Sequence, residues 1–238
     1  DELAALATRY ADDVAALDAG ETSLVKLEKA LHDAEAQYIK AADALSKKRA
    51  KAAQTLEKTV MGELPPLKLE RAKFIVALER DESARGPEGF DHVEFWVETN
   101  PGSRPGPMMK VASGGELSRF MLALKVALAD RGSAPTLVFD EIDTGVGGAV
   151  ADAIGQRLAR LADKVQVLSV THAPQVAARA ATHFLIAKGE AGKTGRVATR
   201  VVTIDDKHRR EEIARMLSGA EITEEARAAA KKLIEAAR

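Results

Sequence analysis

The sequence contains no cysteine among its 238 residues. This excludes disulfide bonds and thiolate metal sites, and it is typical of a protein from a reducing compartment such as the cytoplasm. No apolar run approaches the ~20 residues that a membrane-spanning helix needs. The first residues also lack the basic start and apolar middle of a signal peptide. We therefore expect a cytoplasmic protein with no membrane partner.

An excess of charge of either sign is absent as well. Lys and Arg total 35 and Asp and Glu total 36, which gives a net charge of −1. A balanced chain is not drawn as a whole toward nucleic acid or an acidic surface, although a local basic cluster can still bind one. The first residue is not methionine, so we expect the chain to be part of a longer protein.

Proline is absent from residues 1–60, which are rich in Ala, Leu, Lys, Glu and Asp. Apolar positions there recur in steps of three and four, a pattern that predicts a coiled-coil seam; they are Leu24, Leu27, Leu31, Ala34, Tyr38, Ala41 and Leu45. We expect a helix over residues 21–60, a shorter helix over residues 3–17 before it, and a break at Gly20. The long helix cannot bury its seam alone, so it needs a partner helix.

Four basic residues lie close together late in this helix: Lys47, Lys48, Arg49 and Lys51. Such a cluster can contact DNA phosphates. It can equally be a solvated helix face. The sequence leaves both interpretations open.

Gly62 and the Pro65-Pro66 pair end the helix and mark the clearest domain boundary. We predict a coiled-coil arm over residues 1–60 and a second domain over 61–238. That domain begins with strands over 67–79 and 90–98 and a loop over 100–107. Short apolar strands over 136–139 and 165–170, of the kind buried on both faces, then alternate with helices. Antiparallel strands over 182–188 and 195–204 and two helices follow, so the fold class is α/β.

The stretch VASGGELSR, residues 111–119, begins a helix. Ser113 and Glu116 have the spacing of a capping box, and apolar residues follow at helical intervals. Gly114 and Gly115 are poor helix formers, but they would let a large anion approach the free N–H groups of the helix start. An ordinary capped turn and a polyphosphate site both fit this pattern.

Charged or titratable residues follow both apolar strands. Asp140 and Glu141 end the first strand, at the edge where open α/β sheets bind ligands. Asp140 could hold Mg²⁺ beside phosphate oxygens, and Glu141 could orient or deprotonate a water. Both residues could instead cap the loop. His172 follows the second strand, and the two strand ends could face one crevice, although a lone histidine is often structural.

Ala187 to Thr194, AKGEAGKT, fits the loose pattern of a phosphate-binding loop, with Lys193 and Thr194 in the lysine and hydroxyl positions. A working loop of this kind lies between a strand and a helix. Here the residues after Gly195 alternate as a strand. We therefore interpret the match as a hairpin loop that fits by chance.

Taken together, VASGGELSRFMLALK (111–125), TLVFDEIDTGVGG (136–148) and QVLSVTHAPQVAARA (166–180) resemble the second half of an ABC-type ATPase head. More narrowly, they are similar to the RecN family of SMC-like DNA repair proteins. The resemblance implies the C-terminal lobe of such a head, preceded by a coiled-coil arm. It also implies ATP and Mg²⁺ as cofactors, DNA as a partner, nucleoid association, and recombinational repair of double-strand breaks.

The resemblance also implies roles for individual residues. Ser113, Gly114, Gly115 and Glu116 match the signature motif, which contacts the γ-phosphate of ATP bound mainly to the other subunit of a homodimer. Asp140 and Glu141 match the Walker B pair, for Mg²⁺ and for the attacking water. Asp143 matches a loop that crosses the dimer interface, and His172 matches a histidine near the γ-phosphate.

The family's Walker A loop, with the lobe that bears it, has no counterpart in the sequence. We therefore expect a C-terminal part that needs the N-terminal Walker A lobe as a partner and hydrolyses little ATP alone. One alternative is the nucleotide-binding half of an ABC transporter, but those domains usually lack a long preceding coiled coil and have Gln where this chain has Glu116. Another is a structural SMC-type tether that has lost its ATP chemistry.

Overall fold

A computed structural model describes residues 2–131, 134–140, 142–191, 196–219 and 221–237. The chain divides into two compact units. The first comprises Asp1–Gln54 and Ala77–Glu94, and the second comprises Thr55–Val76 and Phe95–Arg238. The expected boundary between residues 60 and 61 stays a prediction.

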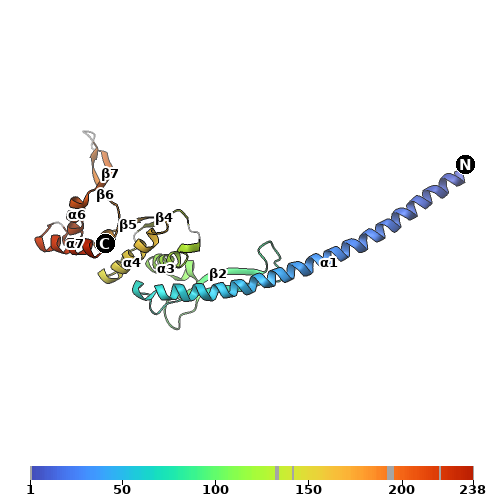
Figure 1. Cartoon of the computed structure of the whole chain (residues 1–238), viewed down its shortest axis with the longest axis horizontal. Coiled ribbons are helices and arrows are strands. Elements are labelled where there is room, and N and C mark those ends of the chain that lie inside the picture. The colour runs from blue at the N-terminus through green and yellow to red at the C-terminus, as the bar shows by residue number, and fades with distance from the viewer. Residues whose placement is uncertain (1, 132–133, 141, 192–195, 220, 238) are drawn as a thin grey trace. The chain divides into compact units, whose positions relative to one another are not determined.

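The first 63 residues contain one uninterrupted helix, α1, which spans Glu2–Glu63 (Figure 1). The expected break at Gly20 is therefore wrong. A glycine inside a helix costs only about 1 kcal/mol relative to alanine, and the helix as a whole is rich in the good helix formers Ala, Leu, Lys and Glu. The helix ends, as predicted, before the prolines, which form the short 3₁₀ helix η1 over Pro65–Leu67.

In the first unit, the loop over residues 81–90 packs against one face of α1. The Tyr38 hydroxyl donates to the Gly86 carbonyl and accepts from the Gly86 N–H, each at 3.0 Å. Asp91 accepts from the Ser46 hydroxyl at 2.8 Å and from the Arg49 guanidinium at 3.0 Å. Part of the predicted seam is therefore covered by this chain itself.

The outer part of the seam is uncovered in the described chain. Leu24 is 57% exposed, Leu27 66% and Leu31 62%. Leaving several leucines in water along one line of a helix is costly, at about 1.5–3 kcal/mol for each side chain that could be buried. The need for a partner helix thus applies to the part of α1 before Ala34.

The strands form three small sheets. In the first, β1 (Lys73–Arg80), β2 (Asp91–Glu98) and β3 (Gly106–Pro107) are neighbours in that order. In the second, β4 (Thr136–Asp140) and β5 (Gln166–Val170) are parallel. In the third, β6 (His183–Ala191) and β7 (Arg196–Ile204) are antiparallel. The first strand begins at Lys73 rather than Leu67, because η1 and a left-handed Lys68 (φ 59°) occupy the preceding residues.

Helices complete the second unit: α2 (Met108–Val111), α3 (Gly114–Ala127), the 3₁₀ turn η2 (Ala129–Arg131), α4 (Gly148–Ala162), α5 (Pro174–Ala177), α6 (Asp206–Ser218) and α7 (Glu224–Ala236). Fully buried Phe120, Leu122 and Ile154 lie at the centre of its main core, which packs α3 and α4 against one face of β4 and β5. At the end of α1, Glu63 forms ion pairs with Arg157 at 3.0 Å and Arg160 at 2.6 Å, both on α4.

The other face of the β4–β5 pair is exposed in the described chain. Val138 is 66% exposed, Leu168 44% and Val170 47%. The expectation that these strands are buried on both faces is therefore wrong for this chain. Successive side chains of a strand point to opposite faces, and α3 and α4 cover only the face that bears Phe139 and Val167.

Candidate functional site

The start of α3 forms the capping box that the sequence predicts. Ser113 is the N-cap, with extended backbone angles (φ −66°, ψ 160°). The Glu116 carboxylate accepts from the Ser113 hydroxyl at 2.7 Å and from the Ser113 backbone N–H at 3.0 Å. These two bonds, the hydroxyl first, lower the pKa of Glu116 below its ordinary value. The carboxylate is thus held ionised at the helix N-terminus, where negative charge is favourable.

The two glycines after Ser113 differ in their surroundings. A Cβ on Gly114 would meet no described atom within 4 Å, so packing within the chain does not require glycine there. A Cβ on Gly115 would lie 3.3 Å from a guanidinium nitrogen of Arg119 and 3.9 Å from the Thr144 carbonyl oxygen. The helix start therefore has open space at Gly114, and the loop after β4 lies beside Gly115.

Asp143 joins the loop after β4 to the loop after β5. This side chain is buried, and its Oδ2 accepts from the Thr171 hydroxyl at 2.5 Å and from the Ala173 N–H at 2.9 Å. The Thr171 oxygen in turn accepts from the Ala173 N–H at 3.0 Å. The carboxylate predicted to serve an interface loop is thus directed into its own chain, where it fixes the residues on either side of His172.

Asp140 is the last residue of β4, and its side chain is exposed. It borders a cavity of about 290 Å³ between α3 and β4, whose lining also includes Ser118 and Lys125. No group of three or more His, Cys, Asp or Glu residues able to hold a metal ion occurs in the part of the chain that the structure describes. A single carboxylate is nevertheless what Mg²⁺ uses when phosphates and waters supply its other ligands. Glu141 lies outside the described residues.

His172 is exposed, two residues beyond the end of β5. Because β4 and β5 are parallel and Asp140 pairs with Val170, both strands end at the same edge of the sheet, as the sequence predicts. Through Asp143 and Thr144, the structure therefore links the start of α3, the loop after β4 and the loop that bears His172.

The AKGEAGKT segment is not followed by a helix. Its first five residues belong to β6, and Ala187 pairs with Arg200 in the antiparallel partner strand β7. Lys193 and Thr194 lie outside the described residues. The observed strand–strand arrangement agrees with the interpretation of this segment as part of a hairpin.

Sequence reasoning missed two residues of this region. The Thr171 hydroxyl donates to Asp143. Its position between a strand and His172 is the sequence feature that could have marked it as part of the site. Arg119 is partly buried beside Gly115, and its Nε has no hydrogen-bond partner among the described residues. Burial lowers the pKa of Arg119 from its ordinary value, with Glu116 opposing the shift. Arg119 lies four residues after Gly115, and this spacing, which puts both residues on the same helix face, could have indicated the contact from sequence alone.

None of the described helices is both long enough and apolar enough to cross a membrane.

Comparison with known proteins identifies close relatives by sequence. No protein-family model matches the chain. It is 41% identical over 235 residues to the DNA repair protein RecN of Xylella fastidiosa (strain 9a5c), covering 98% of this chain and 42% of that protein. It is 45% identical over 199 residues to RecN of Rickettsia bellii (strain RML369-C), covering 83% of this chain and 36% of that protein. The chain thus spans about two fifths of the length of the curated relatives that it matches.

Solved structures with a similar fold are Smc head domains. One, from Pyrococcus yayanosii, has a coiled coil and joint; it aligns with a TM-score of 0.51 at 18% identity, over 69% of this chain and 29% of that chain. Another, from Pyrococcus furiosus, has an extended coiled coil and is bound to the C-terminal domain of ScpA. It aligns with a TM-score of 0.51 at 17% identity, over 73% of this chain and 40% of that chain. The predicted fold class, an α/β head domain preceded by a helical arm, is confirmed by this likeness to Smc head domains with coiled coils.

Proposed function

Because the chain belongs to the RecN family, we propose that it is the C-terminal part of an SMC-like protein that binds and hydrolyses ATP in recombinational repair of DNA double-strand breaks. The link between the start of α3, the loop after β4 and the loop after β5 supports this proposal most directly. It brings Gly115 near Thr144 and joins Asp143 to Thr171 and Ala173, which are segments far apart in the sequence.

Ser113 to Glu116 contact the γ-phosphate of an ATP molecule held mainly by a second subunit. The open space at Gly114 and the free N–H groups of the α3 N-terminus suit a phosphate. The Ser113 proton is donated to Glu116 in this structure. The hydroxyl must therefore rotate away from the carboxylate before it can donate to a phosphate oxygen.

The strand-end residues act on the same phosphate group. Asp140 would hold Mg²⁺, which neutralises charge on the phosphate oxygens when it is bound. Glu141 orients and deprotonates the attacking water, and His172 lies beside the γ-phosphate. Asp143 positions His172 by binding Thr171 and Ala173, and the loop that bears Asp143 crosses the interface with the second subunit.

The uncovered apolar surfaces indicate where the rest of the protein packs. The exposed face of β4–β5 receives the lobe that bears the Walker A loop, and the exposed leucines of α1 receive the other coiled-coil helix. The complete protein then forms a homodimer with ATP between its heads, binds DNA, and works in the cytoplasm on the nucleoid.

ATP-driven association of the complete protein tests this proposal. We expect Glu141→Gln to abolish hydrolysis while the dimer that forms with ATP persists, and Ser113→Arg to prevent that dimer. Asp163→Asn, at an exposed position after α4, is the matched control and leaves both unchanged. Sedimentation with and without ATP measures the dimer. No ATP-dependent association in the unmodified protein would favour a tether without ATP chemistry.

A further inference from the structure

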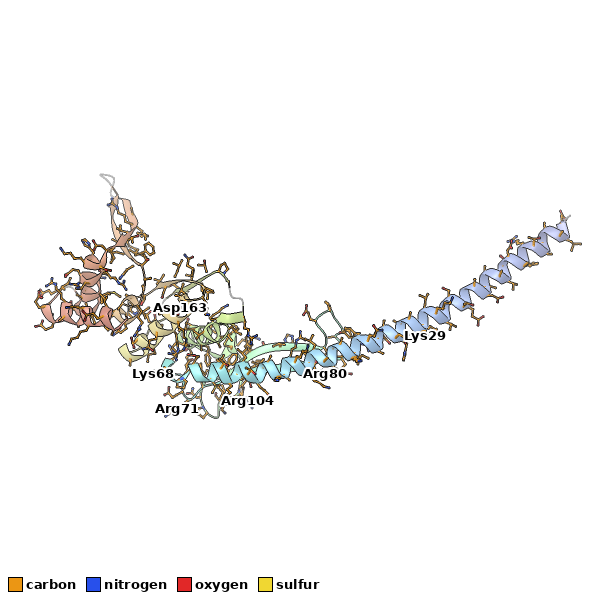
Figure 2. All side chains as sticks on the ribbon, viewed as in Figure 1. Lys29, Lys68, Arg71, Arg80, Arg104 and Asp163 are labelled. Atoms are coloured by element: carbon orange, nitrogen blue, oxygen red, sulfur yellow. The ribbon has the colours of Figure 1, made fainter. Side chains whose placement is uncertain are left out.

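One line of large apolar residues runs along α1 at intervals of seven. Its members are Leu3, Tyr10, Leu17, Leu24, Leu31, Tyr38 and Leu45, and we refer to them as the heptad line. A repeat of seven marks one face of a coiled-coil helix, since seven residues make almost two full turns. Figure 2 labels Lys29 on the bare part of this helix and Arg80 beside the part that the connection between β1 and β2 covers.

The surroundings of the heptad line change between Leu31 and Tyr38. The first five members are exposed in the described chain, by 57% to 84% of their side-chain surface. Tyr38 and Leu45 are instead partly buried beneath the 81–90 loop. The Tyr38 ring packs edge-on against Phe90 with the ring centroids 5.4 Å apart, and a Cβ on Gly89 would lie 3.5 Å from Leu45. The chain itself therefore covers this line of the helix from Tyr38 onward.

Contacts on both flanks hold the loop against α1. Arg85 pairs with Glu35 at 3.1 Å, and Arg80 pairs with Asp43 at 2.7 Å. The Arg80 guanidinium also lies 5.0 Å from the centre of the Phe90 ring. Phe90 is only 4% exposed. A second helix that displaced the loop would break these contacts and expose a buried aromatic ring, so the loop is a costly obstacle on the heptad line.

An open recess of about 480 Å³ lies where the tip of the loop meets α1. It is lined by Ala34, Glu35, Tyr38, Arg85, Gly86 and Pro87. Ala34 follows Leu31 by three residues, the spacing between neighbouring seam positions of a coiled coil. The recess therefore opens at the point where the exposed part of the heptad line ends.

We propose that the 81–90 loop is a stop that ends the two-helix coiled coil of the arm. The other arm helix of the parent protein packs on the heptad line from Leu3 to Leu31, and an apolar side chain at its end enters the recess beside Ala34. Beyond this point no second helix packs on the heptad line, because the loop occupies the same face. The inference deepens the proposed function, on which it rests for the identity of the second helix.

The exposed part of the heptad line is long enough for such a coil. Leu3 to Leu31 is four heptads, or about 42 Å at 1.5 Å per residue, and a seam of at least three to four heptads is typical of a coiled coil. This chain covers 42% of the RecN protein of Xylella fastidiosa, so the rest of a protein of that length can supply a helix of this size.

Photo-crosslinking in the complete parent protein tests the stop. A benzophenone amino acid is placed at one exposed position at a time: Leu31, Ala41 or Lys40. Ala41 follows Ala34 by seven residues, so a helix that continued past the loop would contact it. Lys40 lies about 160° around the helix from Tyr38 and serves as the control. Mass spectrometry of the linked peptides identifies the segment that each position contacts.

We expect Leu31 to link to the other arm helix. The yield of that link at Ala41 should be at most about a tenth of the yield at Leu31, since only side chains in contact react. Lys40 should give no link to the other helix. A link from Ala41 to the other helix as strong as that from Leu31 would overturn the proposal. Links from Leu31 only to a second copy of α1, or to nothing, would overturn it as well.

A shortened loop tests the cause of the stop. In this variant, the segment Ser83–Glu88 is replaced by Asn-Gly, which forms a two-residue hairpin turn. The link at Ala41 should then rise to about the yield at Leu31, and an Ala41 yield that stays low in a folded variant would show that the loop is not the stop. The comparison of Leu31 with Ala41 in the unmodified loop decides the proposal even if this variant misfolds. ATP-driven association is measured separately, so a failed stop leaves the proposed ATPase function to its own test.

Discussion

At the scale of single residues, Glu116 both stabilises and constrains the helix start. Its carboxylate holds Ser113 through two hydrogen bonds, yet it puts a negative charge beside a site proposed for a phosphate. Its pKa is lowered in the folded chain, so its stabilising effect is complete above the ordinary value of 4.5 and is lost as the pH falls through the lower folded value.

Glu116→Ala should therefore destabilise the second unit by about 0.5–2 kcal/mol, the usual range for loss of a helix cap. Urea unfolding at neutral pH measures this difference, and the gap between variant and unmodified chain should narrow as the pH falls below about 4. Glu221→Ala, at an exposed position before α7, serves as the control. If the Glu116→Ala variant and the unmodified chain were equally stable at neutral pH, the capping box would contribute nothing to the free energy of unfolding.

His183, at the start of β6, is the residue from which we expect a pH effect nearer neutrality. Its Nδ1 is buried and has no hydrogen-bond partner among the described residues. Burial, followed by the nearby Arg209, lowers the pKa of His183 below its ordinary value of 6.5. The unfolded chain thus binds a proton at a higher pH than the folded chain does, so stability must fall as the pH drops below about 6.5.

In His183→Leu, the loss of stability between pH 7 and pH 5 should be smaller than in the unmodified chain. Denaturant unfolding at several pH values gives both curves, and their difference isolates this residue from other titrating groups. His32→Leu, on the exposed part of α1, is the matched control and should follow the unmodified curve. Parallel curves for His183→Leu and the unmodified chain would contradict the account.

At the scale of elements, two glycines within helices have opposite surroundings. A Cβ on Gly155 of α4 would lie 2.9 Å from the Arg179 Cδ and 3.2 Å from the Gln175 carbonyl oxygen, so α4 and the α5 region approach closely there. A Cβ on Gly20 of α1 would meet no described atom within 4 Å.

Alanine at these two positions should change stability in opposite directions. Gly155→Ala should destabilise the second unit by about 1–3 kcal/mol through overpacking, which exceeds the gain of up to about 1 kcal/mol in helix propensity. Gly20→Ala should raise the helix content and thermal stability of α1, because only the propensity changes. Thermal melting followed by circular dichroism compares the stability of the two variants. A Gly155→Ala variant more stable than the unmodified chain would contradict the close packing of α4 against the α5 region.

Features that depend on residues close together in the sequence were predicted correctly. The capping box at Ser113 depends on residues three apart, and the shared edge of β4 and β5 follows from two apolar strands separated by a helix. The role of Asp143 was not predictable, because its partner Thr171 is 28 residues away and only folding brings them together. The break at Gly20 and the two-sided burial of β4 were wrong, since the first overrates a single glycine and the second depends on what covers the sheet.

At the scale of the whole molecule, the uncovered surfaces and the strand-end residues have one explanation. Val138, Leu168 and Val170 line one face of a sheet that ends in Asp140, and the described residues include no strand–loop–helix phosphate site at AKGEAGKT. A lobe that packs on this face would complete the sheet and could supply the nucleotide site that the proposed chemistry requires.

ATP hydrolysis by this chain, alone and then mixed with the separately produced remainder of its parent protein, tests the central claim most directly. We predict negligible turnover by the chain alone. The mixture should show Mg²⁺-dependent turnover that Glu141→Gln in this chain abolishes. Robust Mg²⁺-dependent turnover by the chain alone, abolished by the same substitution, would contradict the claim that the chain is one lobe of a composite site.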